Sequence, residues 1–390
     1  MSWLLLSSLL FLLGLGVNIW VHSRARLDIV VEPSGPPPDA ALISVCVPAR
    51  NEQRNIRLCV ESILAQDYPN FEVIVVDDRS TDRTPAILSE LAGIANERRI
   101  PFRIVHGAEL PAGWAGKPHA LHQAALSARG EWLCFIDADT FLAPDTLSSV
   151  YRRAVQTHAD LFTIMTFQVM GSFWEKVVMP LVMSALAFGF SAPRVNDPST
   201  PDAIANGQFI LVRRIAYDAI GGHEGVRDLI VEDKALADRI KQSGRRLIVA
   251  DGTRLARTRM YTSLPEMWEG WTKNIYLGLS DRPALLLLGA FGVLLLLLAA
   301  LMLPLWPLAG LNWYLHGGGW MPLAVISEAL ILWAAIFWTR ARVARRMGIS
   351  GWWALTTPLG AAVFAAMMLT SAWNVLSGRG VTWKGRRYSP

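Results

Sequence analysis

Cysteine and charged residues are both scarce in this sequence. Its 390 residues include 3 cysteines, Cys46, Cys59 and Cys134, and none of them has CxxC spacing. This scarcity excludes a secreted disulfide framework and a zinc ribbon, and it favours buried thiols in a reducing compartment. Charged residues make up 18% of the chain, against about 25% in an average soluble domain. With 52% hydrophobic residues, the chain is too apolar to be disordered as a whole.

Patterns that mark several other classes of protein are also missing. The sequence has no repeat at a solenoid period. No glycine-rich loop with a basic residue follows the first expected strand, which argues against a nucleotidyltransferase. Charges are nearly absent from the apolar runs, which argues against a transporter. Membrane topology explains the modest net charge of +5 better than nucleic acid does, so no nucleic acid partner is expected.

Apolar residues gather near the two ends of the chain. Long runs with at most one charge cover residues 3–21, 284–303, 321–339 and 352–378. A membrane span needs about 20 apolar residues. The first run has neither a basic n-region nor a small-residue cleavage site, which favours an uncleaved anchor over a signal peptide. We therefore expect an N-terminal transmembrane anchor at 1–23 and a C-terminal transmembrane cluster at 283–378.

Basic residues beside these runs predict the orientation of the chain. Arg24 and Arg26 directly follow the anchor, and cytosolic segments are enriched in such residues. We expect a multi-pass protein of the cytoplasmic (inner) membrane whose polar region, residues 41–282, faces the cytosol. A proline-rich linker at 24–40 joins the anchor to this region.

Two interpretations stay open for the last apolar run. A full span at 352–376 would put the basic tail, residues 379–390, outside. A re-entrant hairpin broken near Pro358 and Gly360 would leave that tail in the cytosol, as the positive-inside tendency prefers.

The polar region alternates between strand and helix patterns. Short apolar runs predict strands at 42–47, 71–76, 102–105 and 132–136. Helical patterns predict helices at 55–66, 84–97, 119–128 and 234–243. This alternation predicts an α/β fold with a mostly parallel sheet and flanking helices. Residues 177–193 carry no charge and fit a buried core helix and an in-plane interfacial helix equally well.

Acidic residues follow two of the predicted strands, where parallel sheets bind ligands. Asp137 and Asp139, one residue apart after a buried strand, are suited to a hard divalent cation that also touches a diphosphate. Asp77 and Asp78 follow another strand and can accept hydrogen bonds from a nucleobase edge. Ser80 or Thr81, just beyond them, is expected to cap the next helix.

Three further positions are candidates with competing explanations. Glu232 and Asp233 open a helix, where the helix dipole favours acids, but a carboxylate at such a junction can also act as a general base. Lys117 lies in a glycine-containing loop expected to be flexible, either as a solvated lysine or as a phosphate contact. Trp268 and Trp271 fit either a membrane-interface belt or a surface that seats a sugar or an acceptor.

Taken together, these motifs resemble family-2 glycosyltransferases of the GT-A fold, which is Rossmann-like. The matching segments are Ser44–Glu52, Val75–Asp82, Gly116-Lys117 with Ala120-Leu121, Asp137–Asp139, Asn206–Phe209 with Arg213-Arg214 and Gly221-Gly222, and Glu232-Asp233. The resemblance covers roughly residues 40–280, and the fixed order of the motifs makes it specific.

The resemblance implies a role for each motif. Asp233 would be the base that deprotonates an acceptor hydroxyl in an inverting transfer, with Glu232 beside it. Mg²⁺ or Mn²⁺ would bind at Asp139 and Asp137. Residues that would contact the nucleotide are Pro48, Ala49, Arg50, Glu52, Asp77, Asp78, Lys117 and Asp137. Residues that would contact the acceptor are Asn206, Gly207, Gln208, Trp268, Trp271 and Lys273.

The chain departs from the family pattern in one segment. Many membrane members carry Q/R-x-x-R-W after the Glu-Asp motif, whereas this chain has Met267 and Gly270 before Trp271. We hypothesise that Lys273 supplies the missing positive charge. The pattern is more similar to the ceramide-, carotenoid- and hopanoid-associated enzymes that put one sugar on a lipid than to polymer synthases.

The leading hypothesis is therefore a metal-dependent membrane enzyme that transfers one sugar from a UDP-sugar to a lipid. A processive polysaccharide synthase is the alternative within the class. A non-catalytic membrane protein that binds a nucleotide sugar or a lipid is the alternative outside it, and the intact carboxylates argue against that one. The sequence identifies no protein partner.

Overall fold

The computed structural model describes residues 2–24, 27–279, 283–317, 319–383 and 386–388. The chain divides into two compact units. Unit 1 contains Met1–Arg26, Met170–Ser191 and Tyr261–Pro390, and unit 2 contains Leu27–Val169 and Ala192–Met260. Residues 170–191 and 261–282, which the sequence analysis placed in the polar region, thus belong to the unit that also holds the apolar runs.

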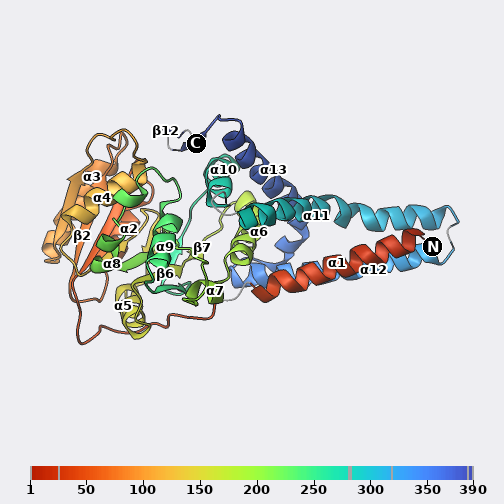
Figure 1. Ribbon diagram of the computed structural model, residues 1–390, viewed down its shortest axis with the longest axis horizontal. Helices are drawn as coiled ribbons and strands as arrows, with labels where there is room; N and C mark the ends of the chain where they lie inside the picture. Colours follow the sequence, from red (N-terminus) through yellow and green to blue (C-terminus); the bar gives the residue numbers. More distant parts are fainter. Residues whose placement is uncertain (1, 25–26, 280–282, 318, 384–385, 389–390) are drawn as a thin grey trace. The chain divides into compact units, whose positions relative to one another are not determined.

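Unit 2, whose strands are drawn as arrows in Figure 1, is built on a seven-stranded sheet within the described residues. The strand order is β3-β2-β1-β4-β8-β6-β9. Its strands are β1 (Ile43–Ala49), β2 (Phe71–Asp77), β3 (Phe102–His106), β4 (Trp132–Phe135), β6 (Leu161–Met165), β8 (Ile210–Arg213) and β9 (Leu247–Asp251). Strand β8 runs antiparallel to both of its neighbours, and the other neighbouring pairs are parallel. The predicted α/β class, the mostly parallel sheet and the four predicted strands are confirmed.

The predicted helices of the polar region are present with small shifts at their ends. The helices of unit 2 are α2 (Ile56–Leu64), α3 (Thr84–Glu97), α4 (Gly116–Ser127), α5 (Thr146–Gln156), α7 (Ala192–Asn196), α8 (Arg214–Ala219), the short η1 (Glu224–Val226) and α9 (Glu232–Gln242). A small sheet joins β5 (Thr140–Leu142), β10 (Ala256–Thr258) and β7 (Phe167–Gln168). Helix α4 begins three residues earlier than predicted and α9 two residues earlier, which brings charged residues into their first turns.

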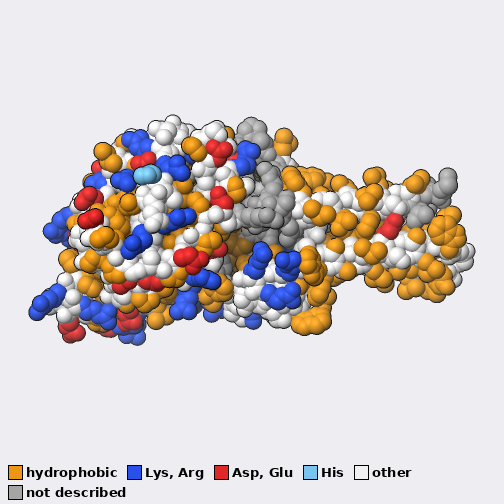
Figure 2. Space-filling view, turned by 90° about the horizontal axis from the view of Figure 1, so that it is seen from below, with side chains coloured by type: hydrophobic (Ala, Val, Ile, Leu, Met, Phe, Trp, Pro, Cys, Tyr) orange, Lys and Arg blue, Asp and Glu red, His pale blue; other side chains and the backbone are white. Residues whose placement is uncertain are grey.

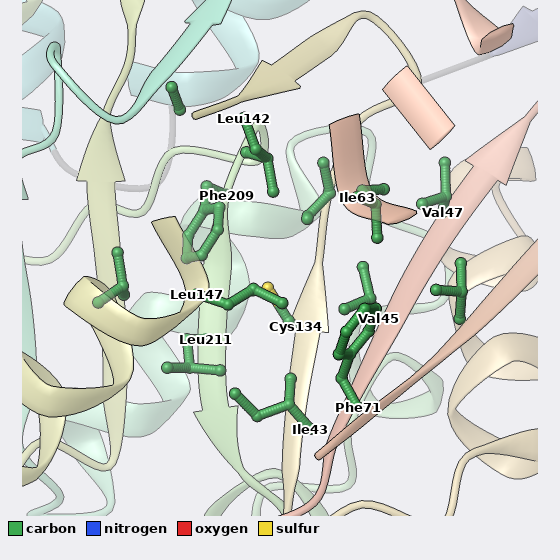
Figure 3. Close-up of a cluster of buried hydrophobic side chains, with 14 of the residues drawn as sticks. Ile43, Val45, Val47, Ile63, Phe71, Cys134, Leu142, Leu147, Phe209 and Leu211 are labelled. Atoms are coloured by element: carbon green, nitrogen blue, oxygen red, sulfur yellow. The ribbon is translucent and has the colours of Figure 1, made fainter. Parts of the chain in front are cut away.

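Both faces of the large sheet are covered by hydrophobic side chains, as a largely parallel sheet requires. Successive residues of a strand point to opposite faces. Accordingly Val45 and Val47 pack in one cluster (Figure 3). Cys46, which lies between them in the strand, packs in the cluster on the other face. All three cysteines lie in the described residues and are buried free thiols, as predicted. This core fixes the strand ends that carry the candidate site.

Unit 1 is mainly helical. Its elements are α1 (Ser2–Arg24), α6 (Phe173–Gly189), α10 (Leu264–Leu279), α11 (Pro283–Leu315), α12 (Met321–Arg346), η2 (Gly351–Thr356), α13 (Thr357–Leu376) and the strands β11 (Val381–Trp383) and β12 (Arg386–Tyr388). Many large hydrophobic side chains of these helices are exposed, and Figure 2 shows a part of the surface where hydrophobic side chains far outnumber charged ones. Such a surface suits lipid rather than water.

Among the described residues, Met321–Arg346 and Gly351–Leu376 are helices long and apolar enough to cross a membrane. Gly289–Met302 and Pro304–Leu315 pass the same criterion only as a pair, bent by 42°, and Leu5–Trp20 is a shorter apolar helix. Helix α13 continues through Gly360, and Pro358 lies in its first turn, where proline is tolerated. The interpretation as a hairpin broken at these residues is therefore not supported.

Helix α6 packs inside unit 1, which bears on one of the two interpretations of residues 177–193, while the in-plane interfacial helix stays a prediction. Its Phe188 ring meets Trp20 of α1 at 4.5 Å between centroids. The Arg340 guanidinium of α12 donates to Ser184 Oγ at 2.9 Å. Gly360 of α13 approaches so closely that an added Cβ would lie 2.5 Å from the Val177 carbonyl oxygen. The segment is thus a packed helix of the apolar unit, not a core helix of the sheet-containing unit.

Candidate active site

The polar residues predicted at strand ends do meet at one edge of the sheet. Strands β2, β1 and β4 are neighbours, and Asp77 is the register partner of Ala49. The Asp78 amide donates to the Ala49 carbonyl at 2.8 Å. Asp137 lies two residues beyond the end of β4. The edge therefore gathers carboxylates from separate segments of the chain.

The loops after β1 and β2 are tied to each other. The Asn51 amide donates to Ser80 Oγ at 3.0 Å, and the Thr81 amide donates to Asn51 Oδ1 at 2.8 Å. Arg50 Nη1 donates to the Asp78 carbonyl at 2.8 Å and lies 3.8 Å from its carboxylate. These bonds join the ends of β1 and β2, where the residues predicted to contact the nucleotide lie: Pro48, Ala49, Arg50, Glu52, Asp77 and Asp78.

The predicted cap of the following helix is wrong. Ser80 uses its hydroxyl to accept from Asn51, so it does not cap α3. Instead Asp82 Oδ1 accepts from the Thr84 amide at 2.9 Å. The loop after β1 uses hydroxyls near the start of α3, because the Asn51 amide donates to Ser80 and the Glu52 amide donates to Thr84. Local sequence does not show these hydrogen bonds, since they join residues far apart in the chain.

Lys117 is not in a flexible loop, because α4 begins at Gly116. Its ammonium lies 2.7 Å from Asp137 Oδ1 and 2.7 Å from Glu232 Oε1. Burial disfavours its charge, but its carboxylate partners hold the pKa of Lys117 well above the ordinary value. The lysine thus links a strand end to the start of α9.

Asp233 lies beside this ion pair in the first turn of α9. Its Oδ2 accepts from the Gly207 amide at 3.0 Å, and its Oδ1 accepts from the Lys234 amide at 2.7 Å. Burial, followed by the Glu232 charge, raises the pKa of Asp233 to about 6. A carboxylate with such a pKa can hold a proton and release it near neutral pH, which general base catalysis requires.

Among the residues predicted to bind the acceptor, Gly207 touches the catalytic candidates most directly. A Cβ at this position would lie 2.9 Å from Asp233 Oδ2 and 3.1 Å from Lys117 Nζ. Its neighbours have a supporting part: Asn206 Nδ2 donates to the Ile164 carbonyl at 2.9 Å, and Gln208 Oε1 accepts from Gln168 Nε2 at 3.0 Å. The turn therefore presents the Gly207 amide to Asp233.

Trp268, Trp271 and Lys273 lie on α10 of unit 1. Trp271 is buried and packs edge-on against Tyr261 at 6.1 Å between centroids. The departure from the family pattern at Gly270 has a steric reason, because a Cβ there would lie 2.3 Å from the Tyr261 hydroxyl oxygen. The acceptor roles of these three residues stay predictions.

The predicted cation site, Asp137 and Asp139, supplies carboxylate oxygens from two side chains. The described residues contain no group of three or more His, Cys, Asp or Glu side chains able to hold a metal ion. Asp139 Oδ1 accepts from Thr258 Oγ1 at 3.2 Å, and Asp137 carries the Lys117 ion pair. Two carboxylates one residue apart match the oxygen ligands that Mg²⁺ and Mn²⁺ prefer, with a diphosphate supplying further oxygens. The residues fit such a cation in part.

A small pocket lies over these groups. Its walls include Lys117, Leu121, Phe135, Ile136, Asp137, Gly207, Ile210, His223, Glu232, Asp233 and Leu236. Sequence reasoning missed His223, although it directly follows the Gly221-Gly222 motif. A lone histidine after two glycines carries no periodic signal, so only the fold reveals that it lines the pocket.

Residues 44–221 match the family model described as Glycosyl transferase family 2. These residues belong to that family. The family 2 domain is similar to 4,4'-diaponeurosporenoate glycosyltransferases of Staphylococcus aureus. It is 27% identical over 239 residues to that of strain MRSA252 and 27% identical over 240 residues to that of strain USA300. Each match covers 60% of this chain and 61% of the relative, so the chain spans about three fifths of these relatives' length.

A solved structure shows the same fold over most of the chain. It is the mannosyltransferase PcManGT from Pyrobaculum calidifontis in complex with GDP-Man and Mn²⁺. The TM-score is 0.56, the identity is 18%, and the match covers 96% of this chain and 97% of that one. The GT-A fold predicted for the family 2 domain is confirmed.

Proposed function

We propose that this protein is a membrane glycosyltransferase that transfers a single sugar from a UDP-sugar to a hydroxyl of a lipid acceptor, with inversion, at the cytosolic membrane face. The family 2 domain and the carotenoid glycosyltransferase relatives support a nucleotide-sugar donor and a lipid acceptor. The apolar helices of unit 1 support a membrane location.

One observation carries the proposal most directly. A carboxylate with a raised pKa, Asp233, shares a pocket with Lys117, whose ammonium suits the diphosphate end of a donor. Asp233 takes the proton from the acceptor hydroxyl while the oxygen of that hydroxyl forms a bond to the anomeric carbon of the sugar. The bond from that carbon to the diphosphate oxygen breaks, and UDP leaves with the electron pair. The Gly207 amide keeps the Asp233 carboxylate oriented for this step.

Lys117 and the carboxylates Asp137 and Asp139 would stabilise the diphosphate of the leaving group, the carboxylates through a bound cation. The Lys117 ammonium sits where it can exchange a carboxylate partner for a phosphate oxygen. Asp137 and Asp139 would hold Mg²⁺ or Mn²⁺, which when bound neutralises charge that develops on the departing diphosphate. Glu232 keeps Lys117 in place from the other side.

The experiment that tests this function measures nucleotide release by the full chain in detergent. UDP-glucose, UDP-galactose, UDP-N-acetylglucosamine and GDP-mannose are each supplied with or without membrane lipid extract and Mn²⁺. Release that depends on lipid, on Mn²⁺ and on one UDP-sugar supports the proposal. Products of increasing length would instead point to a polymerase, and binding without any release would point to a non-catalytic protein.

A further inference from the structure

Tyr217 and His223 form a buried pair of which His223 lines the pocket, and neither residue is used in the function proposed above. His223 is 1% exposed and Tyr217 is 5% exposed. The Phe135 ring meets the His223 ring edge-on at 4.7 Å between centroids. The imidazole is therefore held in one orientation by packing, as a binding group must be.

The hydrogen bonds of the pair indicate which ring nitrogen of His223 carries the proton. The Tyr217 hydroxyl oxygen lies 2.8 Å from His223 Nδ1 and accepts from the His223 amide at 3.0 Å. Burial raises the pKa of Tyr217, so the hydroxyl keeps its proton. Within the described part of the chain, Nδ1 is the acceptor placed against that proton. A neutral imidazole carries one hydrogen on its two ring nitrogens, so with Nδ1 as the acceptor this hydrogen is on Nε2.

Charge and surroundings narrow what this Nε2–H can bind. Burial lowers the pKa of His223 to about 3, so the ring is a neutral donor. Its apolar neighbours on the wall are Phe135, Ile210 and Leu236, whereas Lys117 carries the charge suited to a phosphate. A neutral donor among apolar side chains suits a neutral oxygen on a partly apolar ring, which describes a sugar hydroxyl.

We propose that His223 Nε2–H donates a hydrogen bond to a hydroxyl of the donor sugar, and that Tyr217 fixes the tautomer that makes this possible. The proposal rests on the function proposed above and adds a residue that selects the sugar. A buried donor rejects a sugar lacking the matching hydroxyl, because the donor is then left without a partner. His223 is a binding residue here, and Tyr217 is a positioning residue.

The test uses the full chain in detergent with Mn²⁺ and compares binding of UDP with binding of UDP-glucose, UDP-galactose and UDP-N-acetylglucosamine by calorimetry. His223→Phe removes the donor and keeps a ring, and His223→Gln restores an N–H. Tyr217→Phe removes only the hydroxyl. The matched control is His158→Asn, at a left-handed φ of 53° that asparagine tolerates, before the opposite end of the sheet.

The expected result separates the sugar from the nucleotide. His223→Phe weakens the preferred UDP-sugar roughly tenfold or more, the effect of an unmade buried hydrogen bond, and leaves UDP affinity unchanged. His223→Gln recovers part of the loss, and Tyr217→Phe loses less. The UDP-sugar analogue that lacks the hydroxyl bound by His223 should bind the wild type weakly. His223→Phe should not lower its affinity further, because the hydrogen bond is already absent.

Other outcomes overturn the proposal. An equal loss of UDP and UDP-sugar affinity in His223→Phe would mean that the histidine only supports its neighbour Glu232, and unchanged affinities would mean that it contacts no sugar. If His223→Phe fails to fold, Tyr217→Phe decides the question by the same comparison. A wild-type chain that binds no nucleotide sugar would overturn the proposed function itself, which is a distinct result.

Discussion

The ammonium of Lys117 lies 2.7 Å from Asp137 Oδ1 and 2.7 Å from Glu232 Oε1, so one cation joins carboxylates that are far apart in the sequence. Glu232 is almost fully buried, with 6% of its side chain exposed. A buried carboxylate needs a charged partner, and removing that partner is costly. Lys117 therefore organises the pocket and also occupies Asp137, a predicted metal ligand.

We expect Lys117→Met to change metal and nucleotide binding in opposite directions. Without the ammonium, Asp137 is free of its competitor, and Mn²⁺ measured without nucleotide should bind several-fold tighter. UDP affinity should fall, because a phosphate contact is lost. Calorimetry with each ligand checks both. Lys241→Met is the control, since its ammonium donates to backbone carbonyls of Val195 and Asp197 instead. Weaker Mn²⁺ binding in Lys117→Met would contradict the competition.

Asp233→Asn should lower the transfer rate by about a thousandfold or more while UDP affinity stays within a few-fold, because general base action is removed and little else. The asparagine side-chain oxygen can still accept from the Gly207 amide, which preserves the turn. Rates and UDP binding are measured on the same preparation. Asp218→Asn, on an exposed position of α8, should match the wild type. A collapse of UDP binding in Asp233→Asn would show that Asp233 is not the base.

The pH dependence of kcat/KM should reflect the raised pKa of Asp233. Its ordinary value is 3.8 and its value in the fold is about 6. Below about pH 6 the carboxyl is protonated and cannot take a proton, so activity falls as the pH drops through 6 rather than through 4. Glu232→Gln removes one charge that raises this pKa, and the acidic limb should move to lower pH. A limb that stays in place would argue against Asp233 as the titrating group.

Local patterns of the sequence were enough to predict the sheet but not the pairing of the loops. The apolar runs at β1, β2 and β4 were recognisable because buried parallel strands are continuously hydrophobic. The cap of α3 was mispredicted because Ser80 bonds to Asn51, 29 positions away. Lys117 was predicted as a loop residue because Gly116 and Pro118 resemble a turn, although proline is also suited to the first turn of a helix.

The sequence indicated those residues of the candidate site that lie next to a recognisable strand or helix pattern, and it missed those that depend on tertiary contacts. Asp137 and Asp233 stood next to recognisable strand and helix patterns. His223 depended on Tyr217 and Phe135 coming together, which only tertiary structure provides. The acceptor role of Trp271 stays a prediction, because Trp271 belongs to unit 1 and the pocket residues belong to unit 2.

Gly207→Ala should reduce activity at least tenfold with little loss of stability. The added Cβ would meet Asp233 Oδ2 at 2.9 Å and Lys117 Nζ at 3.1 Å, so both charged ends must move. A displaced catalytic base costs rate even when the shift is small. The control is Gly93→Ala inside α3, where nothing lies within 4 Å. That change should stabilise the chain by about 0.5–1 kcal/mol. Equal activity of both variants would contradict the prediction.

Glu328 is the one charged residue in the apolar run at 321–339, and its carboxylate binds helix α1. It accepts from Ser7 Oγ at 2.5 Å and from Ser8 Oγ at 2.6 Å, and Trp306 Nε1 donates to Ser7 Oγ at 3.2 Å. Polar side chains that bond between apolar helices contribute roughly 0.6–2 kcal/mol each. Helix α1 is therefore held to α12 by specific bonds as well as by packing.

We expect Glu328→Leu to lower the thermal unfolding temperature in detergent by several degrees, because both serine hydroxyls lose their acceptor among apolar groups. Glu328→Gln should lose less, since its amide oxygen still accepts one of the two bonds. The matched control is Ser327→Ala on the same helix, whose hydroxyl donates to the Leu323 carbonyl of its own helix at 2.8 Å. If Glu328→Leu melted at the wild-type temperature, the carboxylate would not hold α1, and packing alone would join the two helices.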